Sequence, residues 1–186
     1  KGLERVISNI RQRNNGVVLG CNIGKNSSTA PENAPQDYLR VFRNLYQYVD
    51  YFTVNVSYNT SFKQYVPRTR ESIISILEPL FDFRRGQNQY RPILLKISPD
   101  LSNEDIDMMT DIMVDTPLDG IVATNGTVRH TGLVTDAEQL KRYGAGAVSG
   151  KPLTKRSVEV VRRVYERSNG TYPIIGVGGI MTPADA

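Results

Sequence analysis

The sequence is poor in the residues that build disulfides, metal centres and stacking surfaces. It has one cysteine, one histidine and no tryptophan among 186 residues. A single cysteine excludes an internal disulfide, so nothing indicates an oxidising compartment. One histidine without Cys, His or acidic residues at ligand spacing argues against a metal site. We therefore predict no metal and interpret His130 as a loop residue.

Long apolar runs, a signal peptide and blocks of like charge are also missing. The longest apolar runs have the length of a strand, far below the ~20 residues that a membrane helix needs. The segment Lys1-Gly2-Leu3-Glu4-Arg5 begins an amphipathic helix instead of a signal peptide. The net charge is +4, but 23 Lys and Arg residues are dispersed among 19 acids. We therefore expect no membrane segment in this chain and no nucleic acid partner.

The sequence does contain short β-branched runs that alternate with helix-length amphipathic stretches. This alternation is typical of βα units that build a parallel sheet. It predicts strands over residues 16–23, 51–57, 92–98, 120–125 and 173–177, with a further short strand near 147–149. It predicts helices over about 3–12, 35–48, 71–83, 103–115 and 157–169.

Polar side chains stand at the ends of four of these strands. They are Asn22, Asn55, Lys96 and the pair Thr124-Asn125. In a (β/α)₈ barrel the carboxyl ends of the strands converge on one mouth, so these groups would surround a common ligand. A doubly wound sheet is the alternative. A closed barrel typically needs ~250 residues, so we predict that residues 1–186 form a single, incomplete α/β TIM-barrel domain.

Lys96 and two glycine segments are the strongest ligand candidates at these strand ends. Lys96 follows an apolar run, where a buried ammonium needs an anionic partner. It is either an ion-pair or surface lysine, or a cation held against a ring that gains negative charge on reduction. Gly176-Val-Gly-Gly-Ile180 follows a strand and precedes a capped helix, as phosphate-binding barrel loops do, and Ser149-Gly150 is a second candidate.

Six segments, in this order, resemble the motifs of dihydroorotate dehydrogenases. They are Asn22-Ile-Gly-Lys-Asn26, Asn55-Val-Ser57, Leu95-Lys96-Ile-Ser-Pro-Asp100, Ile121-Val-Ala-Thr124-Asn125, Ser149-Gly-Lys-Pro-Leu153 and Pro173-Ile-Ile-Gly-Val-Gly-Gly-Ile180. The resemblance covers nearly the whole chain and corresponds to the third to seventh strands of the barrel. The first segment is similar to the quinone-linked class of the family and differs from the cytosolic class.

The resemblance implies an oxidoreductase that uses FMN to convert dihydroorotate to orotate in pyrimidine (UMP) biosynthesis. It also implies a membrane quinone as electron acceptor and a peripheral location on the cytoplasmic side of the membrane. By motif, the FMN contacts would be Asn22, Asn55, Lys96, Thr124, Gly150 and Gly179, and the substrate contacts Asn59 and Asn125. Family segments that bind the membrane and complete the barrel have no counterpart here, so we expect the chain alone to be inactive.

The chain departs from the family at the catalytic base. The family loop reads Asn-x-Ser-Ser/Cys-Pro-Asn, and its fourth residue abstracts the proton. This chain reads Asn55-Val-Ser57-Tyr58-Asn59, which is one residue shorter and lacks the proline. Ser57 is the nearby hydroxyl of the right kind and is therefore the candidate base, one place early in the register.

Two other functions are compatible with the same motifs. One is another FMN barrel that acts on a uracil-type ring, such as a dihydropyrimidine dehydrogenase domain or a dihydrouridine synthase. Those relatives depend on iron–sulfur cysteines or on a basic RNA-binding surface, and neither feature is present in this sequence. The other is a catalytically inactive fragment that serves as an interaction module, which the shortened loop favours.

Overall fold

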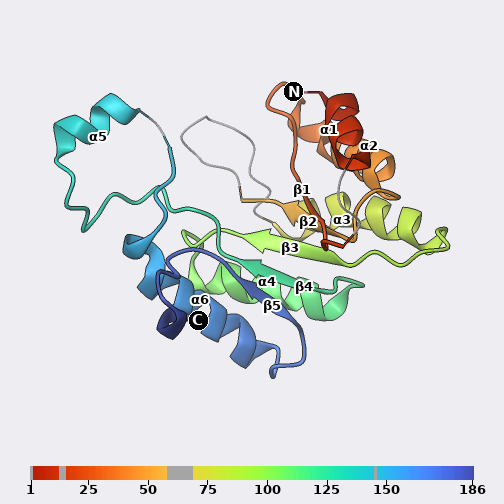
Figure 1. Cartoon of the computed structure of the whole chain (residues 1–186). Helices are drawn as coiled ribbons and strands as arrows, with labels where there is room; N and C mark the ends of the chain where they lie inside the picture. The colour runs from red at the N-terminus through yellow and green to blue at the C-terminus, as the bar shows by residue number, and fades with distance from the viewer. Residues whose placement is uncertain (1, 13–15, 58–68, 145) are drawn as a thin grey trace.

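Five parallel strands form one sheet in the computed structural model, which describes residues 2–12, 16–57, 69–144 and 146–186 (Figure 1). The strands are β1 (Gly20–Ile23), β2 (Tyr51–Asn55), β3 (Ile93–Ile97), β4 (Gly120–Ala123) and β5 (Ile174–Gly176). Their order in the sheet follows their order in the chain. A doubly wound sheet reverses its strand order at a switch point, so the consecutive order excludes that alternative and favours the barrel.

The helices cover the outer face of this curved sheet (Figure 1). They are α1 (Leu3–Arg11), α2 (Ala34–Leu45), α3 (Arg70–Arg85), α4 (Asn103–Asp115) and α6 (Thr154–Arg167), each close to a predicted range. The short 3₁₀ helices are η1 (Pro31–Asn33), η3 (Lys151–Leu153) and η4 (Pro183–Asp185). Cap residues set several helix starts: Ser102 accepts a hydrogen bond from the Asp105 N–H at 3.1 Å.

Successive residues of each strand point to opposite faces of the sheet, which separates the core from the inner face. Outward side chains pack with the helices in one buried cluster that includes Phe52, Val54, Ile93, Leu95, Ile97, Ile121 and Ala123. The residues between them are Thr53 and Asn55 on β2, Leu94 and Lys96 on β3, and Val122 on β4. The inner face therefore carries the polar groups that the sequence places near the strand ends.

Two features of the chain between β4 and α6 differ from the sequence prediction. The strand expected near residues 147–149 is a single antiparallel bridge between Val148 and Thr127. An additional helix, α5 (Ala137–Tyr143), lies on an arm that the structure describes over residues 128–144 and 146–147, away from the sheet (Figure 1). The seven residues of α5 include none that is buried, so no apolar period marks this helix.

Within the ranges that the structure describes, no helix is long and apolar enough to cross a membrane.

A buried ion pair ties α3 to the amino-terminal ends of β3 and β4. The side chain of Arg84 is 6% exposed and lies 2.5 Å from Asp119 Oδ2. It also donates to the Pro117 carbonyl and lies over the Tyr90 ring, 4.6 Å from the ring centroid. Asp119 accepts further bonds from the Ile93 N–H and from the Tyr90 hydroxyl. Each member of the pair thus makes several hydrogen bonds at the end of the sheet opposite the predicted mouth.

Replacing Arg84 with methionine should lower the free energy of unfolding by roughly 3–5 kcal/mol, because Asp119 then loses its cation in a partly buried place. Arg85→Met is the matched control, since Arg85 pairs with Asp82 on the surface of the same helix. That variant should lose no more than about 1 kcal/mol. Urea unfolding measures both, and equal losses would contradict a special role for Arg84.

Candidate active site

The strand register brings the first two predicted site residues together on the inner face. Asn55, the last residue of β2, is the register partner of Lys96 on β3. Lys96 in turn pairs with Val122, and Val122 with Ile175. A row therefore crosses four strands at one level, with an amide and an ammonium at adjacent positions and apolar residues beyond them.

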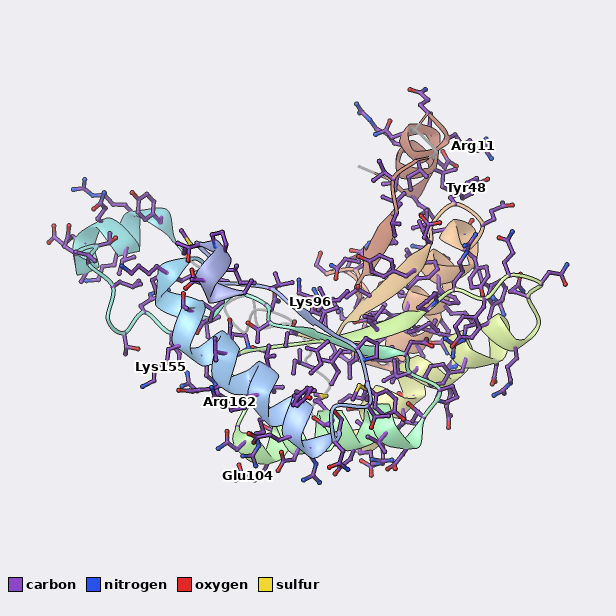
Figure 2. All side chains as sticks on the ribbon, turned by 60° about the horizontal axis from the view of Figure 1, so that its bottom comes forward. Arg11, Tyr48, Lys96, Glu104, Lys155 and Arg162 are labelled. Carbon is purple, nitrogen blue, oxygen red and sulfur yellow. The ribbon has the colours of Figure 1, made fainter. Side chains whose placement is uncertain are left out.

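Lys96 presents its charge on the face of the sheet that the helices leave open. Figure 2 shows it on the opposite side of the sheet from Glu104 of α4 and Arg162 of α6. The residue is partly buried, and among the described residues it forms neither an ion pair nor a hydrogen bond. The ion-pair interpretation therefore finds no partner in the described part of the chain. An ammonium at such a place can bind an anionic or electron-rich ligand.

A chain of hydrogen bonds connects Asn55, Ser57 and Asn125. The Ser57 hydroxyl donates to Asn55 Oδ1 at 2.7 Å, and the Ser57 N–H donates to the same oxygen at 3.1 Å. Asn125 Nδ2 donates to the Ser57 carbonyl at 2.7 Å. The Tyr38 hydroxyl of α2 donates to the Asn55 carbonyl at 2.7 Å. Three of the predicted site residues thus form one connected group at the mouth.

Thr124 connects the end of β4 to the loop after β5. Its side chain is buried, and its hydroxyl lies 3.2 Å from the hydroxyl of Ser157 on α6. Its N–H donates to the Val177 carbonyl at 2.7 Å, and the Val177 N–H donates to the Ala123 carbonyl at 2.6 Å. The bonds hold the glycine-rich loop against the end of β4.

The loop after β5 requires glycine at two positions. Gly178 and Gly179 have φ angles of +102° and +78°, which favour glycine. A Cβ on Gly179 would lie 2.4 Å from the Thr154 backbone nitrogen, and the Gly179 carbonyl accepts a bond from Thr154 Oγ1 at 2.5 Å. Gly150, at φ +82°, has open space around its Cα. A cavity of about 870 Å³ adjoins Gly176–Ile180 and the exposed side of α6.

The helix start that follows this loop is capped as the sequence predicts. Asp185 accepts hydrogen bonds from the backbone N–H groups of Met181 and Thr182, at 3.0 and 2.7 Å. These bonds hold the pKa of the Asp185 carboxyl below its usual range, with the Met181 bond the largest cause. Asp185 therefore stays ionised and keeps the end of the loop in place at neutral pH.

Two predicted residues stand apart from this group. Asn22 is exposed on β1, where its register partner is Thr53, and no hydrogen bond joins it to the other described site residues. Asn59 lies outside the described residues, so its assignment to the substrate stays a prediction.

The sequence interpretation missed the importance of Lys25. This lysine is buried, and its ammonium donates to the carbonyls of Asn26 and Thr29 at 2.8 and 2.6 Å. Asp37 of α2 accepts from the Asn26 N–H at 2.6 Å and from Thr29 Oγ1 at 3.0 Å. Lys25 and Asp37 thus shape the loop that follows Asn22. The sequence signal that could have indicated this role is the position of Lys25, which follows Gly24 directly after a predicted strand.

The consecutive parallel strands, the outer helices and the polar mouth define a protein of the α/β barrel class with a candidate ligand site at the carboxyl ends of its strands. The family model for dihydroorotate dehydrogenase matches residues 1–186. The chain belongs to the dihydroorotate dehydrogenase family.

Curated relatives agree with this assignment. The "Dihydroorotate dehydrogenase (quinone)" of Christiangramia forsetii is 40% identical over 186 residues, which is 100% of this chain and 53% of that protein. The protein of the same name from Corynebacterium striatum is 41% identical over 187 residues, which is 100% of this chain and 50% of that protein. The chain therefore spans about half the length of the curated relatives it matches.

Solved structures show the same fold. The ligand-free type DHODH from Eimeria tenella matches with a TM-score of 0.84 and 26% identity, over 98% of this chain and 55% of that one. DHODH from the same organism in complex with ferulenol matches with a TM-score of 0.81 and 26% identity, over 98% and 52% of the two chains. The predicted incomplete TIM barrel is thereby confirmed.

Proposed function

We propose that the complete protein oxidises dihydroorotate to orotate in pyrimidine biosynthesis, with FMN as its cofactor and a membrane quinone as electron acceptor. The observation that carries the proposal is Lys96, which stands beside Asn55 on the open face of the sheet with no partner among the described residues. Within that protein, residues 1–186 would form one FMN-binding part of the barrel. The names of the curated relatives support the same reaction.

The residues at the mouth fit FMN. Asn55 and Lys96 are adjacent and could bind the polar edge of the ring, while Thr124 directly follows β4 and Asn22 is the last but one residue of β1. The loops at Gly150 and Gly179 bring backbone to the carboxyl edge of the sheet, where a phosphate could bind N–H groups. When bound there, FMN would supply the acceptor for the hydride that leaves the substrate.

The Asn55–Ser57–Asn125 group fits the substrate side of the reaction. The pyrimidine ring offers alternating donors and acceptors, which amides such as Asn125 and Asn59 can match. Oxidation removes a proton from C5 and a hydride from C6, so a base is needed near C5. We assign this role to Ser57, which is buried and whose hydroxyl is oriented by Asn55.

The quinone acceptor rests on two observations. Both relatives described above carry "quinone" in their names, and Asn22-Ile-Gly-Lys-Asn26 resembles the quinone-linked class. A quinone is dissolved in the bilayer, so the complete enzyme would work at the membrane surface as a peripheral protein. In that case the electrons leave the mouth toward a lipid-soluble acceptor.

The complete protein should purify with bound FMN and turn colourless when dihydroorotate is added without oxygen. A short-chain quinone should then restore the flavin absorbance, because it is the proposed acceptor. NAD⁺ and fumarate serve as control acceptors and should act far more slowly. A protein that binds no flavin, or that dihydroorotate does not bleach, would refute the proposed function.

Ser57→Ala should slow flavin reduction by dihydroorotate roughly 10²- to 10⁴-fold, the loss that follows removal of a general base. Orotate binding should change little, because the variant keeps the backbone carbonyl that Asn125 contacts. Ser75→Ala, which removes a hydroxyl from the exposed side of α3, is the control. Stopped-flow absorbance measures the rate, and a near-normal rate would assign the base to another residue.

Lys96→Met removes a positive charge where the ring gains negative charge on reduction. The midpoint potential of the bound flavin should therefore fall, and its reduction should slow roughly 10²- to 10³-fold. Lys155→Met is the matched control, because Lys155 is exposed on α6, on the helical side of the sheet (Figure 2). If both variants bind FMN with the wild-type potential, Lys96 does not contact the flavin.

A further inference from the structure

We propose that Asp100 is a positioning residue that sets the orientation of the substrate amide Asn125. This inference rests on the proposed function, since it takes Asn125 as a substrate contact. Asp100 lies in the loop after β3, and Asn125 lies in the loop after β4. The connection runs through Thr127 and Val128, which follow Asn125 closely in the chain.

Both carboxylate oxygens of Asp100 are used to hold the loop after β4. Oδ1 accepts from the Thr127 hydroxyl at 2.5 Å, and Oδ2 accepts from the Val128 N–H at 2.8 Å. The guanidinium of Arg129 lies 3.5 Å from Oδ1. Thr127 is buried, at 8% exposure, so the donor side of this anchor is shielded from water, while Asp100 is 20% exposed. Hydrogen bonds to an ionised acceptor are about twice as strong as neutral ones.

The backbone from Asn125 to Val128 is held by hydrogen bonds along its length. Asn125 N–H donates to the Ile97 carbonyl at 3.0 Å, and its side chain donates to the Ser57 carbonyl. The Thr127 backbone pairs with Val148 in both directions, at 2.9 and 2.8 Å. A Cβ on Gly126 would lie 2.8 Å from the Ala147 Cβ. Only Gly126 separates Thr127 from Asn125, so we expect a shift at Thr127 to be transmitted to Asn125 through the backbone.

Asp100 can act as a fixed point because its own loop is held by α6. Arg156 donates to the Pro99 carbonyl at 2.9 Å and to the Leu101 carbonyl at 2.8 Å. The Asp100 N–H donates to Ser98 Oγ at 3.1 Å. The residues on either side of Asp100 are thus bound to a helix, while its side chain points to the loop after β4.

Asp100→Asn keeps the shape of the side chain but replaces one acceptor oxygen with an NH₂ donor. That group would face either the Thr127 hydroxyl or the Val128 N–H, and the Val128 N–H cannot accept a hydrogen bond. The anchor is weakened, and Asn125 loses its fixed orientation. Because misplaced contact groups cost up to about 10²-fold, the Kd for orotate and the KM for dihydroorotate should rise roughly 10-fold or more. FMN content and kcat should change far less.

The test uses the complete FMN-loaded enzyme with three variants: Asp100→Asn, Thr127→Val and Asp107→Asn. Thr127→Val removes the hydroxyl that Asp100 binds and should weaken orotate binding in the same direction. Asp107→Asn is the matched control, because both carboxylate oxygens of Asp107 also accept hydrogen bonds, from Arg163 at 2.6 and 2.6 Å, but they join α4 to α6. It should lower the thermal stability and leave orotate affinity unchanged. Isothermal titration calorimetry with orotate measures the affinity.

The outcomes separate this inference from the proposed function. Wild-type protein that binds no orotate would overturn the proposed function itself. If the wild type binds orotate and Asp100→Asn binds it as tightly, the positioning role is wrong. Equal losses in FMN content, kcat and orotate affinity would show a general structural role and also overturn the inference. If Asp100→Asn does not fold, Thr127→Val decides by the same measurements.

Discussion

The parallel register of the strands is the constraint on which the rest of the structure depends. It places Asn55 beside Lys96 although 41 positions separate them in the chain, counting from residue 55 to residue 96. The same register sends alternate side chains to the helices, so the core and the polar face are set by one pattern. A one-residue slip would bury Lys96 in the core and expose Leu95, so packing and ligand chemistry specify the same register.

Charged side chains are partnered differently at the two ends of the sheet. At the amino-terminal end, Arg84 and Asp119 satisfy each other. Along the helices, the hydrogen bond from Arg163 is the largest cause that holds the pKa of Asp107 below its usual range. That carboxylate stabilises the fold above its ordinary pKa and loses this effect as the pH falls through the lowered value. At the carboxyl end, the partly buried Lys96 has no ion pair or hydrogen bond with another described residue.

Much of the fold could be predicted from the sequence because strands and helices repeat with different apolar periods. The candidate site residues could be named from their place after strands, but their mutual contacts could not. Nothing in the sequence shows that Asn125 binds the Ser57 carbonyl or that Asp100 binds Thr127, because each bond joins separate loops. Helix α5 was missed because its signals are only its caps, Asp136 and Gly144. Its exposed surface leaves no apolar pattern to find.

The arm described over residues 128–144 and 146–147 has an evolutionary consequence. Its base is closed by the Thr127–Val148 bridge and anchored by Asp100, while α5 has no buried residue. Substitutions, insertions and deletions in the arm beyond its base would thus have little effect on the packing of the barrel. Gly126 and Thr127, at the base, are constrained by close packing and by the bond to Asp100. Lineages of this family could diverge in the length and sequence of the arm and inherit the same mouth. New surface properties could arise on the arm without altering the residues at the carboxyl ends of the strands.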